Sequence, residues 1–222
     1  MEWIYWLYIL PLVLGAIAYL GKSLDIKASL VGIVLGYIFL FSNVKGFYLL
    51  LTFFVLGTIA TEIGKARKKK LGVEEGKRHI GNVLSNSLSA LLFAIIGSPA
   101  GLAASFSAAL ADTLSSEIGM LSKEKPVSIL TGEEVPIGEN GGITALGSIF
   151  MFVGAFLIGA ISSYLWDINI AWTASWLGVF GCLMDSILGD AFERRGKWGN
   201  NTTNLLATLS AGLMAWIITT MI

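Results

Sequence analysis

The sequence predicts an all-α integral membrane protein, a polytopic helical bundle with about eight transmembrane helices. Of its 222 residues, 55% are hydrophobic and only 14% are charged, and the mean hydropathy is +0.75. A soluble globule of this size needs more polar side chains to cover its surface. Apolar stretches of nearly bilayer-crossing length recur along the whole chain, so lipid has to cover part of the protein.

The apolar stretches divide one transmembrane domain, residues 1–222, into eight expected spans. A helix needs roughly 20 apolar residues to cross the hydrocarbon, and fewer where a bundle thins the bilayer. No basic segment precedes the first stretch, which is longer than a signal-peptide core, so we expect it to be retained as a helix. The expected spans are 3–20, 27–43, 46–63, 82–97, 100–120, 143–165, 170–190 and 203–222.

The basic residues fall on one side of this pattern. Of the 15 lysines and arginines, all but Lys45 follow the first, third, fifth or seventh span. Because cytoplasmic loops carry the excess of basic residues, both termini are expected outside and the working face in the cytoplasm. The longer cytoplasmic loops are 64–81, 121–142 and 190–202. Residues 65–70 are most simply an anchor for anionic lipid headgroups, with attraction of a phosphate or nucleotide as the alternative.

The sequence has only one cysteine and one histidine, which limits the disulfides and metal sites it can form. Cys182 is the one cysteine and His79 the one histidine. The chain therefore forms no intrachain disulfide and no Cys/His zinc cluster.

An internal repeat is indicated by the ends of three spans. Residues 58–64 read TIATEIG, residues 113–119 read TLSSEIG, and residues 185–190 give a looser copy, DSILGD. Short helices rich in Ser, Thr and Gly also resemble one another by composition alone, so duplication and coincidence both remain open.

Three acids lie inside or near the ends of apolar spans: Asp112, Glu117 and Asp185. An ionised carboxylate at a helix centre costs about 2.5–3.5 kcal/mol on insertion scales, so such a residue faces a polar cavity or a partner. Ser116 shares a helix face with Asp112, one turn away. We interpret the three acids as candidate catalytic and metal-binding residues; the alternative is that they contact interfacial water or loop lysines.

Asparagine side chains lie at the beginning of two expected helices, those that follow the cytoplasmic loops 64–81 and 190–202. Asn82 and Asn86 are one turn apart, as are Asn200 and Asn204, so each pair presents two amides on one face. Amides at this level suit phosphate, ribose or metal-bound water. The structural alternatives are helix capping for Asn82 and Asn200 and interhelical hydrogen bonding for Asn86 and Asn204.

The loop 123–142 alternates β-branched residues with turn residues, as a short hairpin does. It ends at Gly141 and Gly142, just before a helix, where unblocked N–H groups suit an anion. Lys125 lies in the same loop. We expect these three residues to contact nucleotide phosphates, although a Gly-Gly pair often only turns the chain.

Taken together, these residues resemble a membrane family that includes plant phytyl-phosphate kinase and many uncharacterised prokaryotic and animal relatives. The resemblance covers most of the chain after about residue 20. Its most specific parts are 111–119, 126–131 and 135–143, with support from 78–86, 185–189 and 200–204. The chain departs from the family pattern at Glu139 and Asn140, where Thr-Asp is usual, and near Asn201, where an Asp is usual.

The resemblance implies transfer of a nucleotide γ-phosphate, from CTP or another nucleotide, to an isoprenyl monophosphate such as phytyl or geranylgeranyl phosphate. Asp112, Glu117 and Asp185 would then hold Mg²⁺, and Asn82, Asn86, Ser116, Lys125, Gly141, Gly142 and Asn204 would bind substrate. Phosphoryl transfer needs cations that neutralise the charge on the transferring phosphoryl group, and it needs little covalent catalysis by the protein. The expected partners are the nucleotide, the isoprenyl phosphate and membrane lipids, not nucleic acid, and the expected location is a prokaryotic cell membrane.

A secondary transporter or channel for a small polar or anionic solute is the competing function. Repeats, glycine-interrupted helices and buried acids are equally typical of transporters. A transporter should carry polar residues on both sides of the midplane, whereas here nearly all lie toward the inner face. No Walker A motif, protein-kinase signature or GxGxxG is present, so any nucleotide site is not of a common soluble kind.

Overall fold

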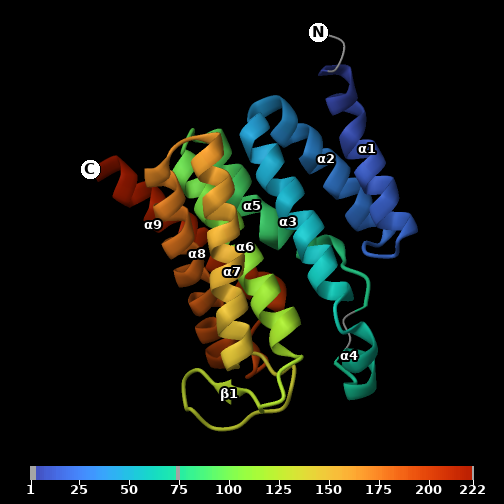
Figure 1. Ribbon diagram of the computed structural model, residues 1–222, viewed down its shortest axis with the longest axis vertical. Coiled ribbons are helices and arrows are strands. Elements are labelled where there is room, and N and C mark those ends of the chain that lie inside the picture. The colour runs from blue at the N-terminus through green and yellow to red at the C-terminus, as the bar shows by residue number, and fades with distance from the viewer. Residues whose placement is uncertain (1–3, 74–75, 222) are drawn as a thin grey trace.

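The computed structural model describes residues 4–73 and 76–221, and the regular structure in these ranges is almost entirely helical (Figure 1). Eight long helices follow the expected spans closely; the expected end residues 3 and 222 lie outside the described ranges. The long helices are α1 (Ile4–Leu20), α2 (Ile26–Ser42), α3 (Val44–Glu62), α5 (Ile80–Ile95), α6 (Pro99–Gly119), α7 (Ala145–Leu165), α8 (Ile168–Leu188) and α9 (Asn200–Met221).

Four shorter elements of the described residues lie in the connections. The short helix α4 (Lys65–Leu71) holds the basic run that the sequence suggested as a loop, and a π-helical turn, η1 (Gly189–Glu193), continues α8. The strands β1 (Val127–Ser128) and β2 (Gly142–Ile143) pair antiparallel. The predicted hairpin is thus present, closed by the residues directly before α7.

Five of the long helices begin at a side chain that caps the first turn. Asp25, Asn43, Ser98, Thr144 and Asp167 precede α2, α3, α6, α7 and α8, and each accepts a hydrogen bond of 2.7–3.1 Å from a first-turn N–H. These caps satisfy helix-end donors that lipid cannot satisfy. They explain why each helix begins where the polar residue stands in the sequence.

Helix α6 is the centre of the bundle. It packs against α3, α5, α7, α8 and α9, and residues 100–111 are all buried. Small residues allow this closeness, because a Cβ on Gly154 of α7 would lie 2.9 Å from the backbone of Ala111. Close approach through small residues is how helices associate in membranes.

Of the eight expected transmembrane helices, four within the described ranges are long and apolar enough to cross a membrane: α3, α7, α9 and α8 continued through η1. The prediction of eight is not confirmed. The apolar parts of α1, α2 and α5 are 17 residues or shorter. Helix α6 has 21 residues, but its surface faces protein instead of lipid and it carries serines and acids.

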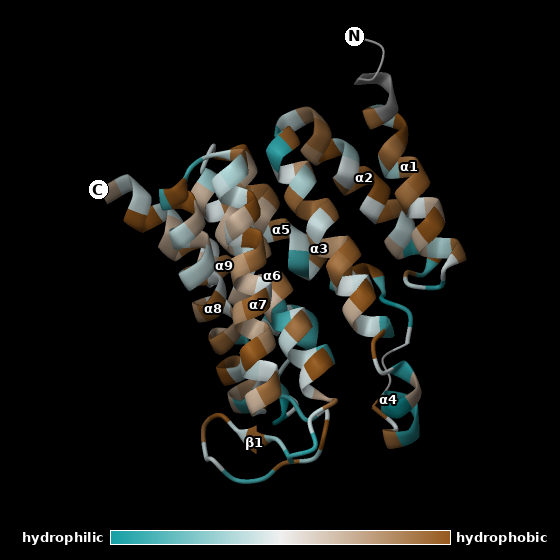
Figure 2. Ribbon diagram, viewed as in Figure 1, coloured by the Kyte–Doolittle hydropathy of each residue, from teal (hydrophilic) through white to brown (hydrophobic). Residues whose placement is uncertain are grey.

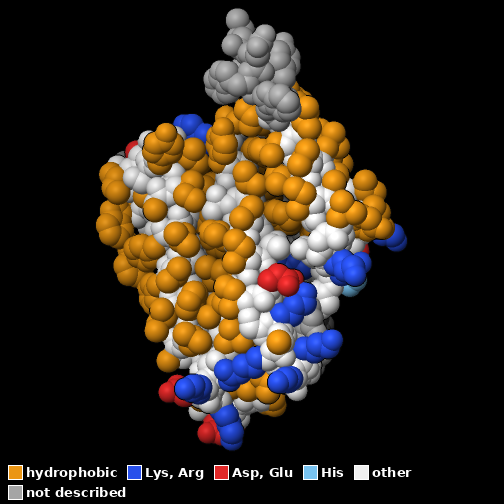
Figure 3. Space-filling view, turned by 45° about the vertical axis from the view of Figure 1, so that its right-hand side comes forward, with side chains coloured by type: hydrophobic (Ala, Val, Ile, Leu, Met, Phe, Trp, Pro, Cys, Tyr) orange, Lys and Arg blue, Asp and Glu red, His pale blue; other side chains and the backbone are white. Residues whose placement is uncertain are grey.

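Polar residues gather at one end of the molecule. Figure 2 shows hydrophilic residues concentrated on α4 and in the loop that holds β1, below helices that are mostly apolar. Figure 3 shows most of the basic side chains on that face toward the same end, with hydrophobic side chains covering the rest. We call the end that carries α4, the β1–β2 loop and η1 the basic end.

Candidate functional site

A polar cavity opens at the basic end, between α5, α6, α8, α9 and the β1–β2 loop. It has about 1180 Å³ of empty space, its open side included. Nine of the ten predicted catalytic and binding residues line it: Asn82, Asn86, Asp112, Ser116, Glu117, Gly141, Gly142, Asp185 and Asn204. We call it the acidic cavity.

Two carboxylates from adjacent helices meet in the acidic cavity. Asp112 of α6 and Asp185 of α8 both line it, with their side chains close enough to interact. They meet because α8 presents small residues to α6: a Cβ on Gly178 would lie 1.9 Å from Oγ of Ser107, and one on Gly181 would lie 2.5 Å from Cβ of Ala108. Two acids this close need a shared proton or a cation between them.

The two asparagine pairs line the cavity beside these acids. The amide nitrogen of Asn86 donates to the carbonyl of Asn82 (2.9 Å), and that of Asn204 donates to Oδ1 of Asn200 (3.1 Å). Oδ1 of Asn82 accepts from the N–H of His79 (3.1 Å). Asn82 is therefore not the cap residue itself; it supports a helix start at His79 while lining the cavity. The Ser116 hydroxyl donates to the Asp112 carbonyl (2.9 Å).

The oxygen donors of this cavity fit Mg²⁺. Oδ1 of Asp185 and Oδ1 of Asn204 are buried and have no hydrogen-bond partner in the structure. Within the described ranges no three His, Cys, Asp or Glu side chains are grouped closely enough to hold a metal ion by themselves. Mg²⁺ is usually bound through one or two carboxylates, with waters and substrate phosphates completing its shell. Asp112, Asp185 and Asn204 match that donor set.

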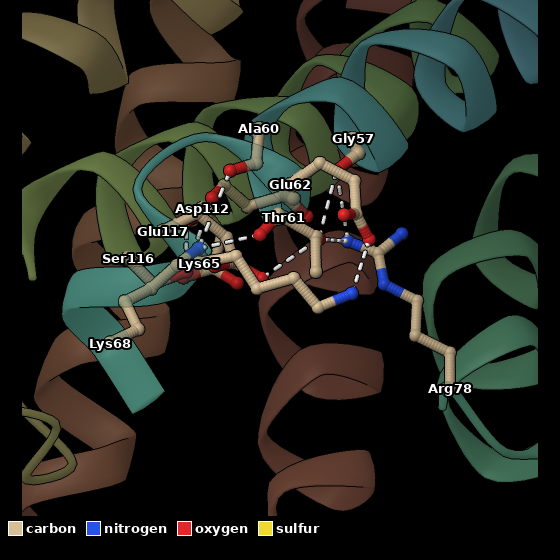
Figure 4. Close-up of polar contacts among 11 residues, drawn as sticks. Gly57, Ala60, Thr61, Glu62, Lys65, Lys68, Arg78, Asp112, Ser116 and Glu117 are labelled. Atoms are coloured by element: carbon tan, nitrogen blue, oxygen red, sulfur yellow. Dashed lines mark hydrogen bonds and ion pairs between the residues drawn. The ribbon is translucent and has the colours of Figure 1, made fainter. Parts of the chain in front are cut away.

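Glu117 differs from the expectation that it binds metal directly. Its Oε2 lies 2.6 Å from Nζ of Lys68, and its Oε1 accepts from the Thr61 hydroxyl at 2.8 Å (Figure 4). Lys68 is 2% exposed. The carboxylate is thus occupied by a lysine, and a role as metal ligand stays a prediction that this arrangement does not support. The interpretation of Lys68 as a headgroup anchor is wrong, since its ammonium group is buried.

The glycine turn also differs from its predicted role. Gly141 has φ +76°, and a Cβ there would lie 2.3 Å from Cβ of Asp190. Asp190 in turn accepts hydrogen bonds from the Ser128 hydroxyl and the N–H of Leu130. The N–H of Gly142 donates to the Glu139 carbonyl (3.1 Å). The turn therefore holds the loop against η1, and the Gly142 N–H is not available to a phosphate.

Lys125 lies outside the acidic cavity. Its side chain is 72% exposed and pairs with Glu134 at 2.6 Å. The hydrogen bond to that carboxylate raises the pKa of Lys125. The structure does not bring Lys125 together with the other predicted residues.

Arg78 is the residue that sequence reasoning missed. It lines the acidic cavity, and its Nη2 donates to Oγ1 of Thr61 (3.0 Å) and to the carbonyl of Gly57 (3.3 Å). The sequence contains it in the stretch 78–86 that carries part of the family resemblance. Nothing local distinguishes it from the other basic residues of the same loop.

An apolar groove meets the acidic cavity at Arg78. The groove runs between α1, α2, α3 and α5 and has about 770 Å³ of empty space, its open side included. Its walls are mainly aliphatic and aromatic, but Arg78, Asn82 and Asn86 line both the groove and the acidic cavity. One ligand can therefore place an apolar tail in the groove and a polar group at this junction beside Arg78.

Comparison with known proteins gives one family. The family model described as "Integral membrane protein DUF92" matches residues 9–212. The chain is 37% identical to the uncharacterized membrane protein MJ0933 of Methanocaldococcus jannaschii, over 98% of this chain and 96% of that protein. It is 27% identical to protein PGR of Arabidopsis thaliana, over 81% and 75% of the two chains. It is also 27% identical to the chloroplast protein VTE6 of that plant, over 78% and 58%. No solved structure is detectably similar.

Proposed function

We propose that this chain, which belongs to the DUF92 family of integral membrane proteins, is a phosphotransferase that acts on a lipid-borne phosphate. The proposed reaction moves the γ-phosphoryl group of a nucleotide to an isoprenyl monophosphate. The family resemblance implies that this nucleotide is CTP. The observation that carries the proposal is the meeting of the apolar groove with the acidic cavity at Arg78, Asn82 and Asn86. The tail of such a lipid would lie in the groove, its phosphate near Arg78, and the nucleotide phosphates in the acidic cavity beyond this junction.

Different residues would bind the two substrates, the nucleotide donor and the lipid acceptor. Asp112 and Asp185, with Asn204, would hold Mg²⁺, which neutralises charge on the transferring phosphoryl group when bound. Arg78 presents a guanidinium group, which suits bidentate binding of phosphate oxygens. An oxygen of the acceptor phosphate forms a bond to the γ-phosphorus as the bond to the β–γ bridging oxygen breaks. The nucleoside diphosphate leaves and the prenyl diphosphate remains in the groove.

Support for the substrate class comes from sequence. The stretches 111–119, 126–131 and 135–143 resemble a family that includes plant phytyl-phosphate kinase. In the structure the first of these stretches contributes Asp112 to the acidic cavity, and the third forms the loop edge of the same cavity. The resemblance and the geometry thus select the same part of the molecule.

The transporter alternative has less support. The lining of the acidic cavity belongs to the basic end, and the middle of α6 is buried by its neighbours. Serines in that part bond across helices, as Ser105 does to the Thr208 carbonyl (3.2 Å) and Ser107 to the Ala155 carbonyl (3.1 Å). These interhelical hydrogen bonds fill the middle of the bundle, so they leave less room for a transport path beyond the acidic cavity.

A direct assay tests the proposal. The purified protein in neutral-lipid nanodiscs receives Mg²⁺, a γ-labelled nucleotide (CTP, ATP, GTP or UTP) and geranylgeranyl monophosphate. We expect label in the diphosphate, and none from the Asp112→Asn variant. Asp167→Asn, at the opposite end of α8, is the matched control and should stay active. Absence of labelled diphosphate with all four nucleotides and with phytyl monophosphate would overturn the proposal.

A further inference from the structure

A second polar cavity lies at the basic end, on the other side of Arg78 and Thr61 from Asp112. It is enclosed by the α1–α2 turn, the last turns of α3, the start of α4 and residues 76–78. Its charged lining residues are Lys22, Glu62, Lys65, Lys77 and Arg78, four basic and one acidic. We call it the basic cavity.

Glu62, the one acid among the described lining residues of the basic cavity, already has a cationic partner. Lys65 Nζ lies 2.8 Å from Oε1 of Glu62. Figure 4 shows Lys65 and Arg78 reaching toward Glu62 from α4 and from the segment before α5. Lys65 neutralises the charge of Glu62, so the other described basic residues of the lining leave a net positive charge. Glu74 and Glu75, which precede this segment in the sequence, lie outside the described residues.

The basic cavity adjoins the apolar groove. Arg78 lines both, and Ser23 of the basic cavity is followed directly by Leu24 of the groove. The backbone fixes this neighbourhood, because the N–H of Arg78 donates to the carbonyl of Ser23 at 3.0 Å and the N–H of Asp25 donates to the carbonyl of Arg78 at 3.2 Å. A lipid whose tail fills the groove therefore has its headgroup within reach of the basic cavity.

Lys22 occupies a backbone position that glycine fills more easily. It is the one non-glycine residue in the described ranges with a positive φ, 60°. It follows the end of α1, where the N–H of Ser23 closes the helix on the Ala18 carbonyl at 3.0 Å. Helices commonly end with glycine in this left-handed conformation. A lysine here costs conformational free energy, which a function of its ammonium group would explain.

We propose that the basic cavity is the subsite for the acceptor phosphate, and that Lys22, Lys77 and Arg78 bind the dianionic phosphate of an isoprenyl monophosphate whose tail lies in the apolar groove. This assignment rests on the proposed function. It places the two substrates on opposite sides of Arg78: the nucleotide with Asp112 and Asp185, and the lipid phosphate with the lysines. Arg78 lines both cavities, so one acceptor oxygen would meet the γ-phosphorus beside Arg78 while the other oxygens contact the lysines, away from the two carboxylates.

Binding without nucleotide tests this subsite independently of turnover. The probe is geranylgeranyl monophosphate, titrated into the protein in neutral-lipid nanodiscs without Mg²⁺. Lys22→Gly and Lys77→Gln should each raise the Kd on the order of tenfold, the loss expected for one charged hydrogen bond. Lys45→Gln, at the opposite end, is the matched control and should leave the Kd unchanged. Lys22→Gly should also keep or raise the melting temperature, because glycine relieves the strain at φ 60°.

The outcomes are distinguishable. Weaker binding in Lys22→Gly and Lys77→Gln supports the subsite even if the transfer assay fails, and that failure would then count against the kinase alone. Unchanged Kd values in both variants would overturn the subsite. A larger loss in Asp112→Asn than in Lys22→Gly would place the phosphate in the acidic cavity and also overturn it. If inorganic phosphate binds as tightly as the prenyl phosphate, the basic cavity is a site for free phosphate and the lipid subsite is overturned. If geranylgeraniol, which lacks the phosphate, competes only weakly with the prenyl phosphate, the result supports recognition of tail and phosphate together.

Discussion

Lys68 and Glu117 form a buried ion pair between α4 and α6, with 2.6 Å between Nζ and Oε2 and side-chain exposures of 2% and 5%. Lys68 also donates to the Thr61 carbonyl at 2.7 Å. Thr61 in turn bonds both Glu117 and Arg78 (Figure 4). The pair therefore anchors the short helix α4 and connects, through Thr61, to the arginine at the junction of the cavities.

Breaking this pair should destabilise the protein strongly. Lys68→Met leaves the Glu117 carboxylate buried without its cation, and loss of one partner of a buried pair costs about 3–5 kcal/mol. The measurement is the free energy of unfolding in detergent. Replacing both partners, Lys68→Met with Glu117→Leu, should recover part of the loss, because no unpaired charge then remains.

The neighbouring exposed pair is the control for that prediction. Lys65 and Glu62 lie 2.8 Å apart with side-chain exposures of 47% and 52%. Surface pairs contribute about 0–1 kcal/mol, so Lys65→Met should change stability little. Equal effects of Lys68→Met and Lys65→Met would contradict the burial of Lys68.

Most helices of the fold could be predicted from the sequence, because apolar stretches and capping residues are local signals. The convergence of Asp112, Asp185 and the asparagines was also predictable, since acids inside apolar helices need a shared polar environment. The burial of Lys68 was not, because a lysine in a basic run looks like its neighbours until the fold brings it to Thr61 of α3 and Glu117 of α6. Arg78 and the apolar groove depend on how α1 and α2 meet α3 and α5, which local patterns do not specify.

Removal of either cavity acid should greatly reduce the stabilisation of the protein by Mg²⁺ and nucleotide. With ligand at 100-fold its Kd, the wild-type melting temperature should rise on the order of 5–10 °C. Asp112→Asn and Asp185→Asn should lose most of this rise because each removes a carboxylate ligand. Asp167→Asn should keep it. A full rise in both cavity variants would remove the acids from the metal site.

The position of the basic end predicts the membrane orientation. With Cys182 replaced by alanine, single cysteines at the exposed positions Lys70, Glu133 and Lys197 should react with an impermeant thiol reagent only from the cytoplasmic side. A cysteine at the exposed position Asn169, in the first turn of α8 next to the α7–α8 connection, should react only from outside. Labelling of Lys70→Cys in intact cells would contradict this orientation.

Acid should weaken the attachment of the α1–α2 turn. The pKa of Asp25 lies below its ordinary value of 3.8, chiefly because its carboxylate accepts from the N–H of Ala28 and also bonds His79. A lowered folded-state pKa means that the stabilisation is complete above the unfolded-state value and declines as the pH falls through the folded-state value. Melting temperatures from pH 6 to pH 3 should therefore fall more steeply for the wild type than for Asp25→Asn, which keeps a capping oxygen. Parallel curves would contradict this contribution.

The transfer assay with Arg78 variants tests most directly whether the cavities and the groove form one active site, because Arg78 lines the acidic cavity, the basic cavity and the apolar groove. Wild-type protein should convert geranylgeranyl monophosphate to a diphosphate that carries the nucleotide's γ-label. Arg78→Gln should raise the KM for the lipid and lower kcat, together reducing kcat/KM on the order of 100-fold or more, while Arg195→Gln, on the exposed loop after η1, should behave as wild type. Equal formation of labelled diphosphate by Arg78→Gln and wild type would contradict the account.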